Sequence, residues 1–483
     1  MIRRVLLVAI PALLTLAAAR ADEAGQRPPI VIDTDMGMDD AVTLALALQH
    51  PDAEIAAIVA CDGIASGERA ADFVEQMLDL FNRRDVAVYA APPAESQRLF
   101  ALRAFAEKVV DNALPPASQK ARRPFSPAAY RVAGQKTTII ALGPLTNLAA
   151  ALRADPELKA DIERVIVANP PEAEQGWNGR HDPAAFAAVR ASGLPLTFVV
   201  STEAALKPPA WCRTDNYVNT PMSLAERFLQ RLLASQSVRS HYLHDLPTLG
   251  DELALLYCFT PEFFKPGDVD GVVVVADVPG LANELDEVAR EGRQHKHWVV
   301  FAEGPVADEL FQEDIRQRKA DIIAKNGRVE WFAQVLMNEL HQHLGAYSIV
   351  GVKMGLRAAE LLNARQHGMR VTSHTLATPP ASCLNDGVIV ATGCTPGRAL
   401  FTQQPDAAAG VAVSFSYNGR RVTLKLKSEY ADQIAAHLAA LVEKHGLEDQ
   451  KYWDAVRVFG LDIWENWHRR DLFDVSAGVE KAE

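Results

Sequence analysis

The stretch Ile30-Val31-Ile32-Asp33-Thr34-Asp35-Met36-Gly37-Met38-Asp39-Asp40 decides the fold. Its three β-branched apolar residues predict a buried strand, and the Ala/Leu-rich segment from Asp40 to Gln49 predicts a helix just after it. Four carboxylates therefore gather within eight residues at the carboxyl end of a strand. In an open α/β sheet, this is the edge at which ligands bind.

These four acids repel one another, and holding them together costs free energy unless a cation or strong donors neutralise them. A hard divalent cation, which takes roughly six to eight oxygen ligands, is suited to this task. A solvated loop is the alternative interpretation. Because the acids interrupt an apolar strand-to-helix junction rather than a polar segment, the pattern favours a cation site.

Short apolar runs alternate with helical stretches through the first 300 or so residues. Near-continuous apolar strands separated by helices predict an α/β fold with an open, mostly parallel sheet covered on both faces. A second helix is expected over Arg69 to Phe81. The other predicted strands are Ile55 to Val59, Thr137 to Ala141, Val165 to Val167, Leu196 to Val200 and Val272 to Ala276.

The last third of the chain has a different pattern of apolar and turn-forming residues, which predicts a separate α+β domain. The charged, turn-rich region from Asn283 to Arg328 is the expected boundary. Two alternating runs, Val411 to Tyr417 and Arg421 to Lys427, flank Asn418-Gly419, which is a strong signal for a β-hairpin. We therefore expect one domain over residues 28–325 and a second over residues 326–476.

The N-terminus predicts export. Arg3-Arg4 precede an apolar run from Val5 to Ala19, and Ala19-Arg20-Ala21 fits the small-x-small cleavage rule. This run is shorter than the roughly 18 to 20 residues that span a bilayer. We expect a signal peptide at residues 1–21 and a periplasmic or secreted protein with no membrane contact after its removal. An uncleaved anchor is the alternative.

Composition and net charge further restrict the class of protein and its partners. Hydrophobic residues make up 49% and charged residues 23%, which is typical of globular domains and excludes extensive disorder. The net charge of −12 disfavours a nucleic-acid partner, which would need a basic surface. Five cysteines in so long a chain do not form a disulfide-stapled scaffold.

Four segments resemble the inosine–uridine-preferring nucleoside hydrolase family. The first is Asp33-Thr34-Asp35-x-Gly-x-Asp39-Asp40, described above. The others follow in order: Ala141 to Ala149 (ALGPLTNLA), Asn178 to Thr197 with Asp182-Pro183, and Asp251 to Phe264. The resemblance implies a Rossmann-like, nucleoside-hydrolase-like sheet. It also implies calcium-dependent hydrolysis of the N-glycosidic bond of a ribonucleoside or related riboside, and it suggests a homo-oligomer.

The resemblance implies a role for particular residues. Asp35, Asp40, Asp251 and the backbone carbonyl of Leu142 would bind Ca²⁺, and Asp35 would also accept the proton of the attacking water. The implied substrate-binding residues are Asp33, Asp39, Asp62 and Asn178. Such a site would combine water activation by a cation with a carboxylate base.

This chain departs from the family at two positions. Gly176 stands where members carry a ribose-binding Glu, and Gly250 stands where many carry a His that assists the leaving base. His244 or His181 could supply the missing acid. A site that loses a buried polar partner can lose orders of magnitude in specificity. The alternative function is therefore a catalytically inactive, exported protein that binds a ligand or metal.

The C-terminal third, over roughly Val329 to Val475, resembles the E subunit of formylmethanofuran dehydrogenase. The resemblance rests on His341-Gln342-His343-Leu344-Gly345 and on the segments around Cys383 and Cys394. It implies a second metal site, with His341, His343, Cys383 and Cys394 as candidate ligands, and imidazole with thiolate suits Zn²⁺ or another transition metal. A disulfide between the two cysteines, or two buried thiols, are the alternatives.

Overall fold

The computed structural model describes residues 28–91, 102–116, 121–200, 223–234, 250–294 and 308–479. The predicted signal peptide and His244 lie outside these ranges. Among the described helices, none is both long enough and apolar enough to cross a membrane.

The first domain is built on a nine-stranded sheet with the order β4-β3-β2-β1-β5-β6-β7-β9-β8. All neighbouring strands are parallel except the pair β8 and β9. The strands are β1 (Ile30–Thr34), β2 (Ile55–Ala60), β3 (Ala87–Ala90), β4 (Arg123–Pro124), β5 (Thr137–Ala141), β6 (Ile162–Val167), β7 (Leu196–Val200), β8 (Phe264–Pro266) and β9 (Val272–Val275). The predicted open, mostly parallel sheet is confirmed, and the sequence missed only the short strands β3, β4 and β8.

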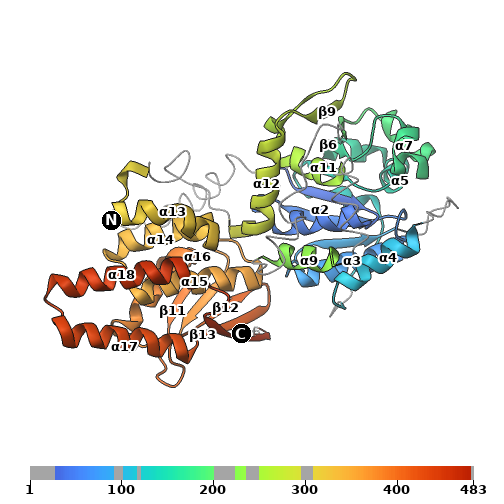
Figure 1. The fold of residues 1–483 in the computed structure, drawn as a ribbon. Coiled ribbons are helices and arrows are strands. Elements are labelled where there is room, and N and C mark those ends of the chain that lie inside the picture. Colours follow the sequence, from blue (N-terminus) through green and yellow to red (C-terminus); the bar gives the residue numbers. More distant parts are fainter. Residues whose placement is uncertain are drawn as a thin grey trace, which may run out of the picture.

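Helices cover both faces of this sheet (Figure 1). Side chains alternate along β1, so that Ile30 and Ile32 enter one hydrophobic core and Val31 enters the other. The helices are α2 (Met38–Gln49), α3 (Gly67–Leu80), α4 (Arg103–Ala113), α5 (Thr146–Ala154), α6 (Trp177–His181), α7 (Pro183–Arg190), α9 (Leu224–Leu232), α11 (Gly250–Phe259) and α12 (Val278–Glu291). α2 is buried along almost its whole length.

The second domain has the predicted α+β architecture. Its five-stranded sheet has the order β11-β10-β12-β13-β14, and the hairpin of β12 and β13 turns at Asn418-Gly419 as expected. Both turn residues have positive φ angles, which Asn and Gly tolerate best. The elements are α13 (Glu313–Asn326), α14 (Arg328–His341), α15 (Ala346–Leu362), β10 (Arg370–Ser373), α16 (Leu384–Thr392), β11 (Phe401–Gln403), β12 (Ala412–Tyr417), β13 (Arg420–Leu426), α17 (Ser428–His445), α18 (Gln450–Asn466) and β14 (Phe473–Val479).

The core of the second domain explains two sequence features. Ile315 and Ile322 of α13 belong to it, so the charged region expected to be a boundary contributes a helix to this core. Trp464 and Trp467 are also buried in it, as expected for an aromatic stripe in a core.

A pair of buried asparagines joins the two domains. Asn82, after α3, donates to the Leu362 carbonyl at 2.8 Å, and Asn363, after α15, donates to the Phe81 carbonyl at 2.7 Å. Both residues have left-handed backbones, with φ angles of 53° and 50°. Each side chain therefore binds the carbonyl that precedes the other asparagine, and the contact lies at the amino edge of the nine-stranded sheet.

Replacing Asn363 should test this contact. Asn363→Ala removes the bonds to Phe81 and Leu48 and keeps a β-carbon in the left-handed region. We expect a loss of about 2 to 4 kcal/mol in the free energy of unfolding, measured by urea denaturation. Asn363→Gly is the matched control, because it removes the same bonds without backbone strain, and it should lose less. Equal stability of Asn363→Ala and the wild type would contradict the assignment.

Candidate functional site

The predicted site residues of the first domain converge at the carboxyl edge of four adjacent strands. Asp35 follows β1, Asp62 follows β2 and Leu142 follows β5, and Asn169, which is not one of the predicted residues, follows β6, in the spatial order β2-β1-β5-β6. Asn178 on α6 reaches the same place, because its amide donates to the Leu142 carbonyl. The sheet thus gathers groups that are more than 100 residues apart in sequence.

The alternation of β1 decides which way the first two polar residues point. Asp33 lies on the face of Val31, where Tyr130 and Asn147 donate to its carboxylate, and only 2% of its surface is exposed. Thr34 lies on the opposite face and donates to Asp40 on α2. The Asp33 carboxylate is therefore turned into the core, where Tyr130 and Asn147 hold it, and its role in substrate binding stays a prediction.

Three carboxylates form the densest cluster at this edge. One oxygen each from Asp39, Asp40 and Asp251 lie within 4.8 Å of one another. Asp40 and Asp251 are 3% and 6% exposed, and Asp251 is held in the first turn of α11. Asp251 thus joins the acids of the β1–α2 junction across more than 200 residues.

Asp35 lies beside this cluster and is surrounded by the backbone of the loops after β2 and β5. Its Oδ2 accepts the backbone N–H of Ile64 at 2.8 Å. A β-carbon at Gly63 would lie 1.9 Å from the same oxygen, and one at Gly143 would lie 2.9 Å from the Asp35 nitrogen. Both glycines are therefore required for the loops after β2 and β5 to pack against Asp35.

Three acids at this edge are hard to ionise in the metal-free protein. Burial and the charge of Asp40 raise the pKa of Asp39 to about 7, and the same two causes raise the pKa of Asp35 well above its usual range. The pKa of Asp251 is also raised well above its usual range, by burial and by the charges of Asp40 and Asp39. A divalent cation among these oxygens would offset the repulsion from Asp40 and favour the charged form of each buried carboxylate.

Asp62 is already engaged by two basic residues. Arg103 on α4 donates to its Oδ2 at 3.2 Å, and the His181 Nε2 lies 3.6 Å from the same oxygen. Burial alone would raise the pKa of Asp62, but His181 and Arg103 outweigh it, so the pKa is lowered. Asp62 is therefore a fixed carboxylate that links the two sides of the site. Sequence reasoning missed Arg103, because no local pattern marks it.

The two departures from the family pattern have different structural settings. A β-carbon at Gly176 would lie 1.8 Å from the Asn169 side-chain oxygen, so the Asn169 amide already fills the space that a Glu would need. A β-carbon at Gly250 would meet no described atom within 4 Å. The packing of Asn169 therefore leaves no space for a Glu side chain at position 176, whereas position 250 has room for a side chain.

A second candidate site lies where α14 meets α15 and α16. The Nδ1 of His341 lies 2.9 Å from an Asp386 oxygen, and the Nδ1 of His343 lies 3.1 Å from the His341 carbonyl. A β-carbon at Gly345 would lie 3.1 Å from the Nε2 of both histidines. The two Nε2 atoms thus face one small space, and that of His341 is buried without a hydrogen-bond partner among the described residues. Outer partners at Nδ1 with Nε2 left free are the usual arrangement of metal-binding histidines.

The two cysteines of this domain do not lie together. Cys383 caps the start of α16, one turn before Asp386, whereas Cys394 follows the other end of this nine-residue helix. Cys394 is fully buried, and its thiol donates to the Met369 carbonyl. Both cysteines are free. The disulfide alternative is thus wrong, and Cys394 is not a ligand of the histidine site. Cys383 remains a candidate, with a thiol pKa raised by burial and by the charge of Asp386.

Comparisons with known proteins agree with both resemblances. Residues 30–317 match the family model described as inosine-uridine preferring nucleoside hydrolase. Residues 340–474 match the model described as FmdE, molybdenum formylmethanofuran dehydrogenase operon.

Curated relatives include two pyrimidine-specific ribonucleoside hydrolases named RihA. That of Klebsiella pneumoniae subsp. pneumoniae is 29% identical over 253 residues, which are 49% of this chain and 81% of the relative. That of Shewanella oneidensis is 34% identical over 188 residues, which are 35% of this chain and 57% of the relative. Among solved structures, a purine-preferring ribonucleoside hydrolase from Gardnerella vaginalis is 21% identical with a TM-score of 0.45, and the match covers 54% of this chain and 98% of that one.

The acid cluster predicts how a divalent cation and pH act together on stability. Because the pKa values of Asp35, Asp39 and Asp251 are raised in the folded, metal-free protein, the stability they contribute is present at low pH and is lost as the pH rises, for Asp39 through about 7. We therefore expect calcium to raise the melting temperature more at pH 8 than at pH 5, in scanning calorimetry against a chelator. Asp251→Asn should raise the metal-free melting temperature at pH 8 and remove most of the calcium effect. An equal calcium effect at both pH values would contradict the cluster as a cation site.

Proposed function

Since this chain belongs to the inosine–uridine preferring nucleoside hydrolase family, we propose that it hydrolyses the N-glycosidic bond of a ribonucleoside or related riboside with the help of Ca²⁺. The observation that carries the proposal is the cluster of half-buried Asp39 with buried Asp40 and Asp251, which lies beside Asp35. Asp35, Asp40, Asp251 and the Leu142 carbonyl are the groups that would hold the ion. These ligands are all oxygens, as calcium prefers.

The donor set fits a doubly charged ion on physical grounds. The pKa values of Asp35, Asp39 and Asp251 are all raised, and the charge of Asp40 is one cause in each case. These groups cannot all be charged near neutral pH without a compensating cation. When bound, the ion would orient a water molecule and make it more acidic.

The residues of the chain around the proposed ion have separate roles in the reaction. Asp35 accepts the proton of the attacking water, and the Ile64 N–H holds its carboxylate in one orientation. Asp39 and Asn178 would bind ribose hydroxyls. The sugar passes through an oxocarbenium-like state, as in other glycoside cleavages. Arg103 and Asp62 hold the loop that supplies Ile64, because Arg103 also donates to the Gly63 carbonyl.

The altered positions bear on the alternative function of an inactive binding protein. Asn169 takes up the space beside Gly176, and no side chain at Gly250 assists the leaving base. These changes remove contacts to the sugar and the base, but they leave the cation ligands in place. We therefore expect a substrate preference different from that of ordinary family members rather than loss of hydrolysis.

For the second domain, we propose binding of Zn²⁺ or a similar transition metal by His341 and His343, with Cys383 as a third candidate ligand. The convergence of the two Nε2 atoms over Gly345 supports it. The lowered pKa of His343, caused by burial and by His341, favours the neutral imidazole that binds metals. Export, as predicted from residues 1–21, would place both activities outside the cytoplasm.

The Asp35→Asn variant tests the hydrolase. We expect a loss of roughly two to four orders of magnitude in kcat, because the amide cannot accept the proton, in a reducing-sugar assay with a panel of nucleosides. Asp270→Asn, an exposed substitution of the same kind, is the control and should keep full activity. A chelator should abolish the wild-type activity, and calcium should restore it. A wild type that releases no sugar from any nucleoside with calcium present would favour the inactive binding protein.

Metal analysis tests the second site. His341→Ala and His343→Ala should each lose most of the transition metal that the purified wild type carries, measured by plasma mass spectrometry. Cys394→Ser is the matched control, because Cys394 lies at the far end of α16, and it should keep the metal. Unchanged metal content in both histidine variants would refute the assignment.

A further inference from the structure

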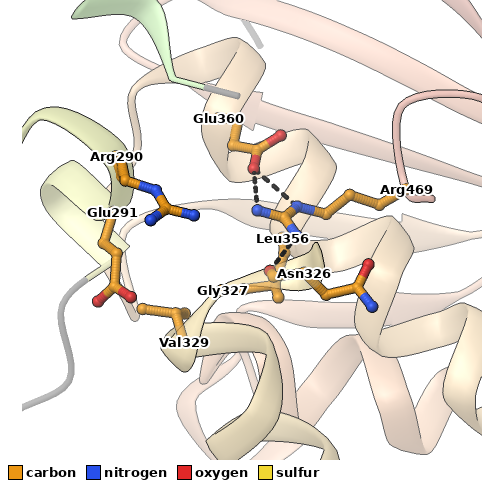
Figure 2. A pocket seen from close by; sticks show the side chains of 8 residues that line it. All are labelled: Arg290, Glu291, Asn326, Gly327, Val329, Leu356, Glu360 and Arg469. Atoms are coloured by element: carbon orange, nitrogen blue, oxygen red, sulfur yellow. Dashed lines mark hydrogen bonds and ion pairs between the residues drawn. The ribbon is translucent and has the colours of Figure 1, made fainter. Parts of the chain in front are cut away.

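The hollow beside α12, shown in Figure 2, is lined by as many acidic as basic side chains. Its charged lining residues are Arg290, Glu291, Glu360 and Arg469. Glu360 and Arg469 also bind each other, because the Arg469 Nε donates to the Glu360 carboxylate at 2.7 Å. This set of charges gives no sign of a missing partner. The histidine site of the second domain differs in this respect.

The histidine site is open on the side of its two Nε2 atoms. Asp386 contacts His341 at Nδ1 and therefore leaves Nε2 available. Among the described residues, three metal-ligand atoms within 4.8 Å of one another are found only at the acid cluster. The two Nε2 atoms and the Cys383 thiol thus do not already form a closed set of ligands. A zinc ion with three or fewer protein ligands keeps a position for an outside ligand.

The first turn of α15 begins at the same place and carries unpaired backbone donors. The N–H groups of Ala346, Tyr347 and Ser348 have no acceptor among the described residues, and all three residues are buried. The Ser348 Oγ lies 2.8 Å from the position that a β-carbon on Gly345 would take, and the Nε2 atoms of both histidines lie 3.1 Å from it. Free donors and free imidazole nitrogens therefore meet beside Gly345.

This combination favours a negatively charged ligand. The N-terminus of a helix carries about half a positive charge and binds anions through its first N–H groups. α15 has 17 residues, so this effect is fully developed. The His341 side chain is only 10% exposed, and its Nε2 lacks a hydrogen-bond partner in the described structure. Both polar atoms of the Asn338 amide, one turn earlier on α14, are likewise buried and unpaired among the described residues.

An aromatic side chain next to His343 indicates that the ligand also has an apolar part. The ring of Trp453 stands at 75° to the His343 ring with the centroids 5.3 Å apart, and 41% of Trp453 is exposed. The indole is held in place, because its Nε1 donates to the Leu447 carbonyl at 3.0 Å. Apolar surface beside a few polar groups is the usual composition of a site for a small organic molecule.

We propose that the histidine site binds a small organic carboxylate, with one oxygen on the metal and the other on the first N–H groups of α15. The apolar body of the ligand would lie against Trp453. This inference rests on the metal site proposed above for the second domain. It makes that site a place of ligand recognition rather than a structural metal centre, which would be closed by four protein ligands.

Cobalt substitution tests the proposal on the full-length protein. Co²⁺ replaces the native metal, and its visible spectrum reports ligands at its own site while excess calcium fills the acid cluster. We expect both acetate and benzoate to shift the cobalt bands, and benzoate to bind about tenfold more tightly because its ring contacts Trp453. Sulfate, an anion without an apolar part, should bind more weakly than benzoate. Tighter binding of sulfate would overturn the assignment of an organic ligand.

Two variants separate the parts of the site. Ala346→Pro removes one N–H donor at the first position of α15, which tolerates proline, and the extended backbone of Gly345 suits the residue before a proline. This variant should keep its cobalt and bind benzoate about tenfold more weakly. Ser428→Pro, at the exposed first position of α17, is the matched control and should bind as the wild type does. Trp453→Ala should lose the preference for benzoate over acetate.

The outcomes distinguish this inference from the metal site on which it rests. Cobalt uptake that is unchanged in both His341→Ala and His343→Ala would refute the metal site and the carboxylate together. Normal cobalt uptake with bands that neither acetate nor benzoate shifts would refute the carboxylate alone. The same conclusion would follow if Ala346→Pro and Trp453→Ala bound both carboxylates as the wild type does.

Discussion

The main physical constraint on this structure is the mutual repulsion of the carboxylates that gather at the β1–α2 junction. Asp35, Asp39 and Asp251 gather around Asp40 where a parallel sheet ends, and burial raises the cost of charging these three. The same geometry makes the place useful, because a cation that enters it meets oxygen ligands already held in position. The metal-free site therefore carries an electrostatic cost that the proposed cation would relieve.

The two edges of the nine-stranded sheet serve different purposes. The carboxyl edge holds the acids, whereas the amino edge holds the second domain through Asn82 and Asn363. α2 connects them, since its first turn carries Asp40 and the Leu48 carbonyl in its last turn accepts from Asn363. Asp40 and Leu48 are eight residues apart in α2, so at about 1.5 Å per residue the helix separates the two places by about 12 Å. The second domain thus supports the first without covering its site.

Both candidate metal sites rely on partners that fix the orientation of a ligand. Ile64 holds Asp35 through a backbone N–H, and Asp386 holds His341 through Nδ1. In both places a glycine lets the groups approach, Gly63 beside Asp35 and Gly345 beside the histidines. Such outer contacts reduce the reorganisation that binding requires, and they distinguish a built site from a chance cluster of the same residue types.

The sequence by itself determined the local features: the apolar strands, α2, the Asn418-Gly419 hairpin and the acids at the end of β1. These follow from periodicity and turn chemistry, which act over a few residues. Only the tertiary structure decided that Asp33 faces Tyr130, that Arg103 binds Asp62, and that Cys394 lies apart from His341. Those outcomes depend on which strand face a residue occupies and on which distant helix packs there. Side-chain direction and long-range packing are set by the assembled core, and no short stretch of sequence encodes them.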